Sequence, residues 1–249
     1  MQLHIEHKLA SELVLPINYN HILQSILYNA LKGDESFAKR IHEQGYQNKK
    51  RSYKMFQFSQ LKGKYRVQQK KIIFMDSVSF EVRSPDERIL NNMREHFLSN
   101  GISYGMQHFD EVSVRLENKT IEQPEIVIKM VSPLTVHTTD KITKKTMYYR
   151  PDCERFRELI NDNFERKYEA YTREKPLGML EFEPVSFREK DKVVTRYKGF
   201  YICGWLGTYR LKGDEKYLDF VYQTGLGDRN SQGFGMFETI ERGCKKHAV

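Results

Sequence analysis

Hydrophobic and polar residues alternate at the start of the chain and then change to a helical spacing. A strand with one buried face is typical of the first pattern, whose inward positions are Leu3, Ile5, His7 and Leu9. After a break at Pro16, apolar residues recur every three or four positions as far as Leu31, which predicts an amphipathic helix. We expect Asn20 to cap this helix and Gly33 to end it.

The remainder of the first half continues with one more pair of strands, a helix and a strand. A short helix is predicted over residues 34–45, followed by extended segments at 55–65 and 70–84. A helix over 86–100 and a strand region over 102–117 complete the series. The order strand, helix, strand, strand, helix, strand is that of the ferredoxin-like fold, which RNA-recognition domains also use.

The same order of elements recurs after residue 120. Its segments are predicted at 124–137, 152–172, 178–187, 193–211, 214–225 and 234–240. The two halves share this pattern without visible sequence identity. We therefore predict an α+β protein of two tandem ferredoxin-like (RRM-like) domains, residues 1–120 and 121–249, with a C-terminal glycine-rich loop.

Charge and cysteine content narrow the class of partner and the compartment. Lys and Arg number 41 against 33 Asp and Glu, a net charge of +8 that suits a polyanionic partner without requiring one. The cysteines, Cys153, Cys203 and Cys244, have no CxxC spacing, which disfavours a zinc site and a disulfide framework. With no apolar signal or membrane-spanning segment in the sequence, we expect a soluble, cytoplasmic protein without a membrane partner.

The glycine-rich segment GLGDRNSQGFG, residues 225–235, matches neither common nucleotide-binding motif. A GxGxxG pattern would need glycine at Asn230, and no GK[ST] follows. Two readings remain open: a tight connection that glycine permits, or a loop whose backbone approaches an RNA phosphodiester closely. In the second reading the RNA-binding residues are Gly225, Gly227, Arg229, Gly233 and Gly235.

A tyrosine and a histidine near the N-terminus are candidates for acid–base chemistry. Tyr28 lies on the helix face opposite the apolar stripe, and His42 lies in the following short helix, just before a basic run. RNA supplies its own nucleophile, the ribose 2′-OH, so a Tyr, a His and a Lys at one phosphate suffice for cleavage without a metal or other cofactor. The sequence shows no cluster of Asp, Glu and His with metal-ligand spacing and no local Cys/His pair, so it does not favour a metal-dependent nuclease or a cysteine nucleophile.

Further basic residues are candidate contacts for the RNA backbone. Besides the glycine-rich segment, they are Arg51, Lys54, Lys141, Lys144 and Lys145. The segment KGFYICGW, residues 198–205, partly matches an RNA-recognition signature, but Tyr201 and Ile202 depart from it. We interpret this segment as an ordinary strand. The remaining histidines, including His137 and His247, we interpret as surface or core residues.

Two segments about 200 residues apart resemble one known family. LPINYNHILQSILYNAL near the N-terminus and GLGDRNSQGFGMFE near the C-terminus are similar to the CRISPR-associated endoribonucleases that process precursor CRISPR RNA within repeats, the Cas6 family. The resemblance spans nearly the whole chain and includes the tandem ferredoxin-like order. It implies metal-independent cleavage by 2′-OH attack, which leaves a 2′,3′-cyclic phosphate and a 5′-hydroxyl.

The resemblance also implies roles for particular residues. The tyrosine of the family's YNA context matches Tyr28, and the histidine of its [IL]-H-E segment matches His42. The family's lysine lies shortly after the histidine, but the position six beyond His42 is Asn48, so the candidates are Lys49 and Lys50. Active sites vary in this family, and His21 is an alternative histidine.

The implied partner is CRISPR repeat RNA, both as precursor and as mature CRISPR RNA. A homodimer and association with subunits of a CRISPR interference complex are further possibilities. Two alternatives to the metal-independent nuclease stay open at this point: a non-catalytic RNA-binding subunit of a CRISPR complex, and a metal-dependent nuclease.

Overall fold

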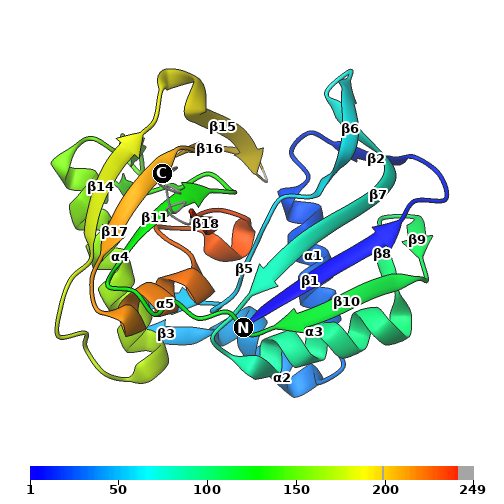
Figure 1. Cartoon of the computed structure of the whole chain (residues 1–249), viewed down its shortest axis with the longest axis horizontal. Coiled ribbons are helices and arrows are strands. Elements are labelled where there is room, and N and C mark those ends of the chain that lie inside the picture. Colours follow the sequence, from blue (N-terminus) through cyan, green and yellow to red (C-terminus); the bar gives the residue numbers. More distant parts are fainter. Residues whose placement is uncertain (198, 241–249) are drawn as a thin grey trace, which may run out of the picture.

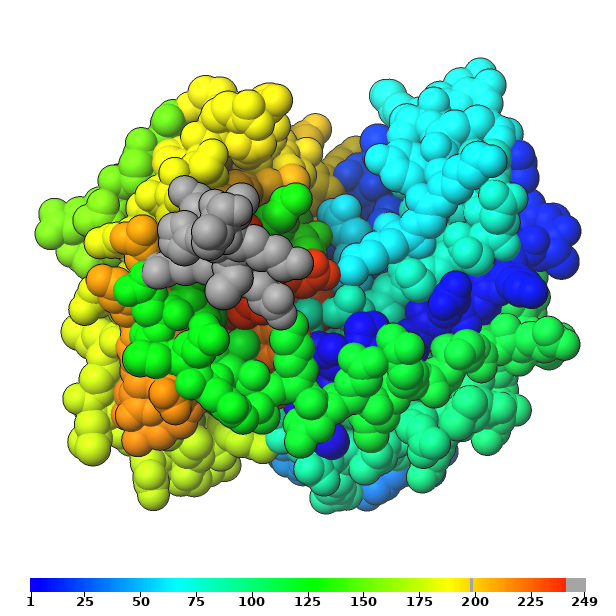
Figure 2. All heavy atoms as spheres, viewed as in Figure 1, coloured from blue at the N-terminus to red at the C-terminus, as the bar shows by residue number. Residues whose placement is uncertain are grey.

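Two sheets, one from each half of the chain, lie side by side in the computed structural model (Figure 1). The structure describes residues 1–197 and 199–240. Figure 2 shows the surface hollowed between the projecting cyan β6 region and the yellow surface of the C-terminal half. None of the helices within these residues is long and apolar enough to cross a membrane.

The N-terminal sheet has the strand order β10-β1-β7-β2, in which β1 and β2 pair with successive parts of one edge of β7. Strands β5 and β6 pair with the opposite edge of β7. Strands β10, β1, β7 and β6 are therefore placed as the fourth, first, third and second strands of a ferredoxin-like fold. The bounds are β1 Gln2–Lys8, β2 Leu13–Pro16, β5 Gln57–Phe58, β6 Lys62–Gln68, β7 Lys71–Arg83 and β10 Val112–Glu117.

The C-terminal sheet has the order β14-β17-β11-β18, which is the same ferredoxin-like arrangement. The predicted fold is thus confirmed, α+β with the ferredoxin-like strand order in both halves. The bounds are β11 Glu125–Met130, β14 Glu181–Ser186, β17 Thr208–Lys212 and β18 Phe237–Ile240.

Helices cover one face of each sheet and bury the apolar stripes seen in the sequence. Leu23 and Leu27 of α1 are fully buried against the first sheet, and Phe156 of α4 is fully buried against the second. The helical elements are α1 Asn20–Ala30, α2 Glu35–Lys39, a π-turn η1 Arg40–Gln44, α3 Glu87–Asn100, α4 Glu154–Thr172, 3₁₀ turn η2 Glu189–Asp191, α5 Glu215–Thr224 and 3₁₀ turn η3 Asn230–Gln232.

Short hairpins complete the described part of the chain. They are formed by β3 Tyr46–Asn48 with β4 Arg51–Tyr53, β8 Ile102–Tyr104 with β9 Gln107–Phe109, β12 His137–Thr139 with β13 Thr146–Tyr148, and β15 Lys192–Tyr197 with β16 Phe200–Trp205.

Three local expectations were wrong. Helix α1 ends at Ala30 with Leu31 as its C-cap, and not at Gly33. The N-cap position of α1 is Tyr19, without a side-chain cap, because the Asn20 amide donates instead to the carbonyl of Gln232, 3.1 Å away. Residues 193–211 were expected to pair as one run with the preceding strand. Only β17 pairs with β14, whereas β15 and β16 pair with each other.

Buried polar contacts join the two halves. The fully buried Arg83 donates to the carbonyl of Phe237, 2.6 Å away, and the Gln57 amide donates to the carbonyl of Tyr222 at 2.7 Å. Met55 packs in the C-terminal core, and Tyr46 contacts both cores, although both residues precede position 120. The boundary near residue 120 stays a prediction, and the β3–β4 region is the link that brings N-terminal residues onto the second half.

Candidate functional site

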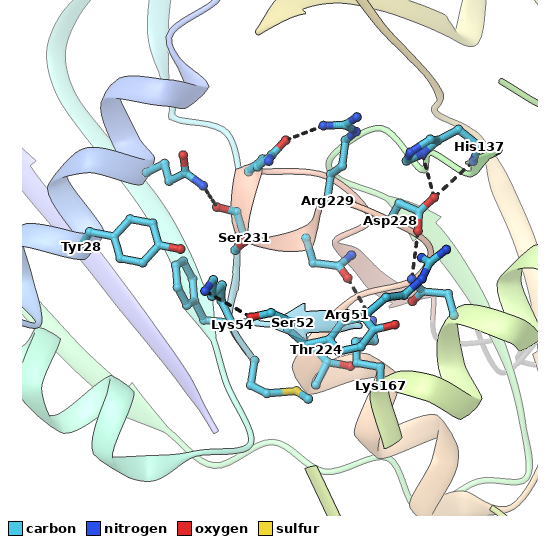
Figure 3. Close-up of a pocket in the computed structure, with 17 residues that line it drawn as sticks. Tyr28, Arg51, Ser52, Lys54, His137, Lys167, Thr224, Asp228, Arg229 and Ser231 are labelled. Atoms are coloured by element: carbon cyan, nitrogen blue, oxygen red, sulfur yellow. Dashed lines mark hydrogen bonds and ion pairs between the residues drawn. The ribbon is translucent and has the colours of Figure 1, made fainter. Parts of the chain in front are cut away.

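An open cleft of about 430 Å³, here called the interdomain cleft, lies where the two halves meet (Figure 3). Its walls come from α1, the β4 region, α4 and the glycine-rich segment. The lining residues are Gln24, Tyr28, Arg51, Ser52, Tyr53, Lys54, Met55, Phe56, His137, Asn163, Lys167, Thr224, Asp228, Arg229, Asn230, Ser231 and Gln232.

A second cleft, here called the helix cleft, runs along the exposed face of α1 toward α2 and η1. It is lined by His21, Gln24, Ser25, Tyr28, Asn29, Lys32, Glu35, Ala38, Lys39 and His42. Gln24 and Tyr28 line both clefts and therefore form the wall between them. His21 is in the same cleft as Tyr28 and His42, with its Nδ1 atom 2.9 Å from the carbonyl oxygen of Asn18.

Tyr28, His42 and Lys54 come together at this wall. The rings of Tyr28 and His42 meet edge to face with centroids 4.9 Å apart, and Phe56 packs on Tyr28 at 5.6 Å. Lys54 Nζ donates to the main-chain carbonyl of His42, 2.8 Å away. The structure thus brings the two residues predicted for acid–base chemistry into contact, with a lysine beside them.

Burial shifts the pKa of two of these side chains. It raises the pKa of Tyr28 to about 12, because the charged phenolate would lose its solvation there. The phenol therefore keeps its proton at neutral pH. Burial also lowers the pKa of Lys54, because the charged ammonium loses part of its solvation.

The predicted catalytic lysines, Lys49 and Lys50, lie at the tip of the β3–β4 hairpin. Both are exposed, and neither lines the interdomain cleft or the helix cleft. Asn48, six positions beyond His42, is buried, and its amide donates to Glu169 Oε2 at 2.7 Å and to the carbonyl of Arg166. Asn48 therefore holds the β3–β4 hairpin against α4 and is not available for catalysis. The lysine beside His42 is Lys54, which the sequence analysis predicted only as an RNA contact.

The glycines of the glycine-rich segment are buried and face protein atoms. Gly235 has φ +79°, and a Cβ there would lie 2.0 Å from the carbonyl oxygen of Leu226. A Cβ at Gly233 would lie 2.7 Å from the Asn20 amide nitrogen. In this structure glycine is needed for the compact path of the segment. The cleft itself is lined by the polar residues between the glycines, from Asp228 to Gln232.

Three titratable side chains in the interdomain cleft, Lys167, Asp228 and His137, were not predicted as site residues from the sequence. Lys167 is 3% exposed, and its Nζ donates to Asn230 Oδ1 at 2.9 Å and to the carbonyl of Gly225. Burial lowers the pKa of Lys167 to about 7. Asp228 Oδ2 lies 2.8 Å from His137 Nδ1. Burial acts to raise the pKa of Asp228, but the adjacent His137 ring and the hydrogen bond that the His137 main-chain N–H donates to Oδ2 at 3.2 Å outweigh it and hold that pKa below the usual value.

The other predicted RNA contacts lie at different depths. Arg51 is exposed on the rim of the interdomain cleft, and Arg229 is half-buried there with Nη1 3.2 Å from Gln232 Oε1. An exposed turn joins β12 to β13 and is here called the basic turn; its members are Lys141, Lys144 and Lys145.

The segment resembling an RNA-recognition signature lies mostly on β16 and exposes two aromatic rings. Phe200 and Tyr201 are 75% and 69% exposed. Lys198, Cys244 and His247 lie outside the described residues. No group of three or more His, Cys, Asp or Glu side chains placed to hold a metal ion is found in residues 1–197 and 199–240.

The protein combines two tandem ferredoxin-like domains with a cleft between them, and the glycine-rich segment forms part of the wall of that cleft. A family model described as "CRISPR associated protein Cas6, C-terminal" matches residues 116–239. "CRISPR-associated endoribonuclease Cas6 1" of Methanocaldococcus jannaschii is 29% identical, over 97% of this chain and 93% of that protein. "CRISPR-associated endoribonuclease Cas6" of Pyrococcus furiosus is 26% identical, over 94% and 87%.

A solved structure titled "CRISPR associated protein Cas6" superposes with a TM-score of 0.75 at 27% identity. The match covers 97% of this chain and 99% of that one. The chain belongs to the Cas6 family of CRISPR-associated proteins.

Proposed function

We propose that this chain is a metal-independent endoribonuclease that cuts precursor CRISPR RNA within its repeats. The observation that carries the proposal is the contact of Tyr28, His42 and Lys54 at the wall between the two clefts. Two of these residues are those that the family resemblance implied. The names of the relatives, CRISPR-associated endoribonucleases, support the reaction class and the substrate.

In the proposed reaction His42 is the general base. It takes the proton of the ribose 2′-OH, and the freed oxygen attacks the adjacent phosphorus in line with the 5′-oxygen. The bond from the 2′-oxygen to phosphorus forms as the bond to the 5′-oxygen breaks. The products are a 2′,3′-cyclic phosphate and a 5′-hydroxyl.

Tyr28 is the proposed general acid. Because its pKa of about 12 keeps the phenol protonated, it can give a proton to the departing 5′-oxygen but is poorly suited to remove one. Its phenolate then recovers a proton from the charged His42, whose ring packs against it. The two residues return to their starting states after each turnover.

Lys54 is the proposed cation for the transition state, in place of Lys49 or Lys50. Its Nζ donates to the carbonyl of His42 at 2.8 Å and to Ser52 Oγ at 3.3 Å, which holds the ammonium beside His42 and leaves one donor for a phosphate oxygen. A positive charge that is partly removed from water stabilises the developing negative charge more strongly than an exposed lysine does.

The interdomain cleft is the proposed path of the RNA backbone toward the cut. Arg51 and Arg229 offer guanidinium groups there, and the glycine-rich segment supplies the wall. The basic turn extends the positive surface beyond it. We propose both precursor and mature repeat RNA as ligands, while a homodimer and contacts with interference-complex subunits stay predictions.

The test uses purified protein and end-labelled repeat RNA, with and without EDTA. The proposal expects cutting at one position in EDTA, and a fall of about 10²–10⁴-fold in single-turnover rate for His42→Ala. The matched variant His21→Ala removes the other histidine of the helix cleft and is expected to keep most of the activity. RNA binding without cutting under all conditions would instead indicate a non-catalytic subunit, and loss of cutting in EDTA a metal-dependent nuclease.

A further inference from the structure

Gln24 is a buried polar side chain on the helix that carries Tyr28. It is 9% exposed and lies four positions before Tyr28, so the two side chains are neighbours on one face of α1. Both residues line the interdomain cleft and the helix cleft. A buried amide needs partners for its donor and its acceptor, and those of Gln24 come from the other half of the protein.

The donor and the acceptor of the Gln24 amide bind two different elements of the C-terminal half. Its Nε2 donates to the main-chain carbonyl of Ser231 in the 3₁₀ turn η3, 2.7 Å away. Its Oε1 accepts a hydrogen bond from the Tyr197 hydroxyl of β15. Tyr197 is buried in one apolar cluster with Phe234 of the glycine-rich segment. Gln24 therefore joins α1, the glycine-rich segment and the β15–β16 hairpin at one point.

Two asparagines that precede Gln24 fasten the same two elements. The Asn20 amide donates to a main-chain carbonyl of η3, 3.1 Å away, and Asn18 Oδ1 accepts a hydrogen bond from the Thr195 hydroxyl of β15 at 2.8 Å. These contacts hold η3 and β15 near the N-terminal end of α1. Of the three residues, Gln24 is the one closest to Tyr28 along the chain, about one helical turn away.

The position of η3 decides how wide the interdomain cleft is at the Tyr28 hydroxyl. Figure 3 shows this hydroxyl pointing toward η3, where Ser231 lies. The rings of His42 and Phe56, nearly perpendicular to that of Tyr28, limit where the Tyr28 ring can lie. With the ring held in place, the distance from the hydroxyl to the opposite wall depends on the contact between Gln24 and the Ser231 carbonyl.

We propose that Gln24 is a positioning residue for proton donation by Tyr28. It fixes the glycine-rich segment and the β15–β16 hairpin against α1, and so sets the width of the cleft where the scissile phosphate meets the phenol. The proposal rests on the proposed function, since it requires Tyr28 to protonate the departing 5′-oxygen. A displaced wall lets the phosphate sit away from the phenol, and an error of about 1 Å in such a geometry can lower a rate about 10²-fold.

The test compares cleavage of ordinary repeat RNA with that of an RNA in which sulfur replaces the 5′-oxygen at the cut. Because a thiol has a pKa of about 8.5, a thiolate leaves without a proton, and this RNA needs no general acid. Gln24→Met keeps the length of the side chain but has no amide, and on ordinary RNA it is expected to lower the single-turnover rate about 10-fold. On the sulfur-substituted RNA it is expected to cut within about 2-fold of the wild-type rate.

Further variants complete the comparison. Tyr28→Phe should be slow on ordinary RNA and recover on the sulfur-substituted RNA, whereas His42→Ala should stay slow on both, because the 2′-OH still needs a base. Gln68→Met, at an exposed position of β6, controls for the loss of a glutamine amide. Melting temperatures verify folding. If Gln24→Met fails to fold, Gln24→Glu replaces it, since its length is unchanged and its carboxylate has no donor for Ser231.

The outcomes separate the two proposals. A Tyr28→Phe variant that cuts ordinary RNA at the wild-type rate, or that does not recover on the sulfur-substituted RNA, contradicts the role of Tyr28 in the proposed function. If Tyr28→Phe recovers but Gln24→Met stays slow on the sulfur-substituted RNA, the positioning role alone is overturned. A wild-type rate for Gln24→Met on ordinary RNA overturns it as well.

Discussion

Lys167→Met tests whether the buried side chain of Lys167, which contacts the glycine-rich segment, is neutral in the folded protein. Burial lowers the pKa of Lys167 to about 7 in the folded protein, whereas an unfolded lysine titrates near about 10.4. Between these pH values the unfolded chain binds more protons than the folded one, so the free energy of unfolding rises with pH. This contribution is complete above the unfolded pKa and is lost as the pH falls toward 7.

The size of the effect follows from the same two values. A single group that is neutral when folded and charged when unfolded changes the free energy of unfolding by about 1.4 kcal/mol per pH unit. From pH 7.5 to 9.5 the wild type should therefore gain about 2–3 kcal/mol relative to Lys167→Met, which has no group to titrate at this position. Other titrating groups cancel in the comparison, because both proteins contain them.

Urea unfolding of both proteins at intervals of half a pH unit measures the difference. Lys175→Met, at an exposed position after α4, controls for the loss of one positive charge at the surface. A difference between wild type and Lys167→Met that stays constant from pH 7.5 to 9.5 would show that the buried lysine keeps its proton, and would refute the reasoning.

Three further predictions concern cleavage, RNA binding and the path of the chain. Lys54→Ala should lower the single-turnover rate about 10²-fold, and at least about 10-fold more than Lys49→Ala or Lys50→Ala; equal effects would contradict the choice of lysine. Replacing the three lysines of the basic turn by alanine should reduce the slope of log affinity for RNA against log salt concentration by about 0.7 per lost phosphate contact. An unchanged slope would show that RNA does not contact this turn. Gly235→Ala should lower the free energy of unfolding by at least about 2 kcal/mol, because its Cβ would lie 2.0 Å from a carbonyl oxygen; a stability near wild type would contradict the packing.

The sequence pattern was sufficient for the fold because the relevant signals are local. Alternating residues such as Leu3 and Ile5 are buried in β1, and Asp34 caps α2 through a hydrogen bond from the Phe37 amide. The Asn20 cap failed for a different reason. A distant partner, the glycine-rich segment, competes for the same side chain, and local capping preferences contain no information about such a contact.

The floor of the interdomain cleft could not be predicted in the same way. Lys167 lies in an amphipathic helix among ordinary charged residues, and His137 stands alone at the end of an apolar run. Each becomes a candidate only when α4 and the glycine-rich segment meet. The sequence likewise does not distinguish Lys54 from the other basic residues of this region. Only the structure shows that Lys54 contacts His42, whereas Lys49 and Lys50 lie exposed at the tip of the β3–β4 hairpin.

Cleavage of a repeat RNA with a single 2′-deoxy nucleotide at the cut site tests the central claim most directly. The 2′-oxygen is the proposed nucleophile, so its removal should abolish cutting while RNA affinity changes little. The unmodified RNA should be cut in EDTA to a 2′,3′-cyclic phosphate and a 5′-hydroxyl. Cutting of the deoxy RNA at the normal site, or a product with a 5′-phosphate, would contradict the account, because either result requires a nucleophile other than the ribose hydroxyl.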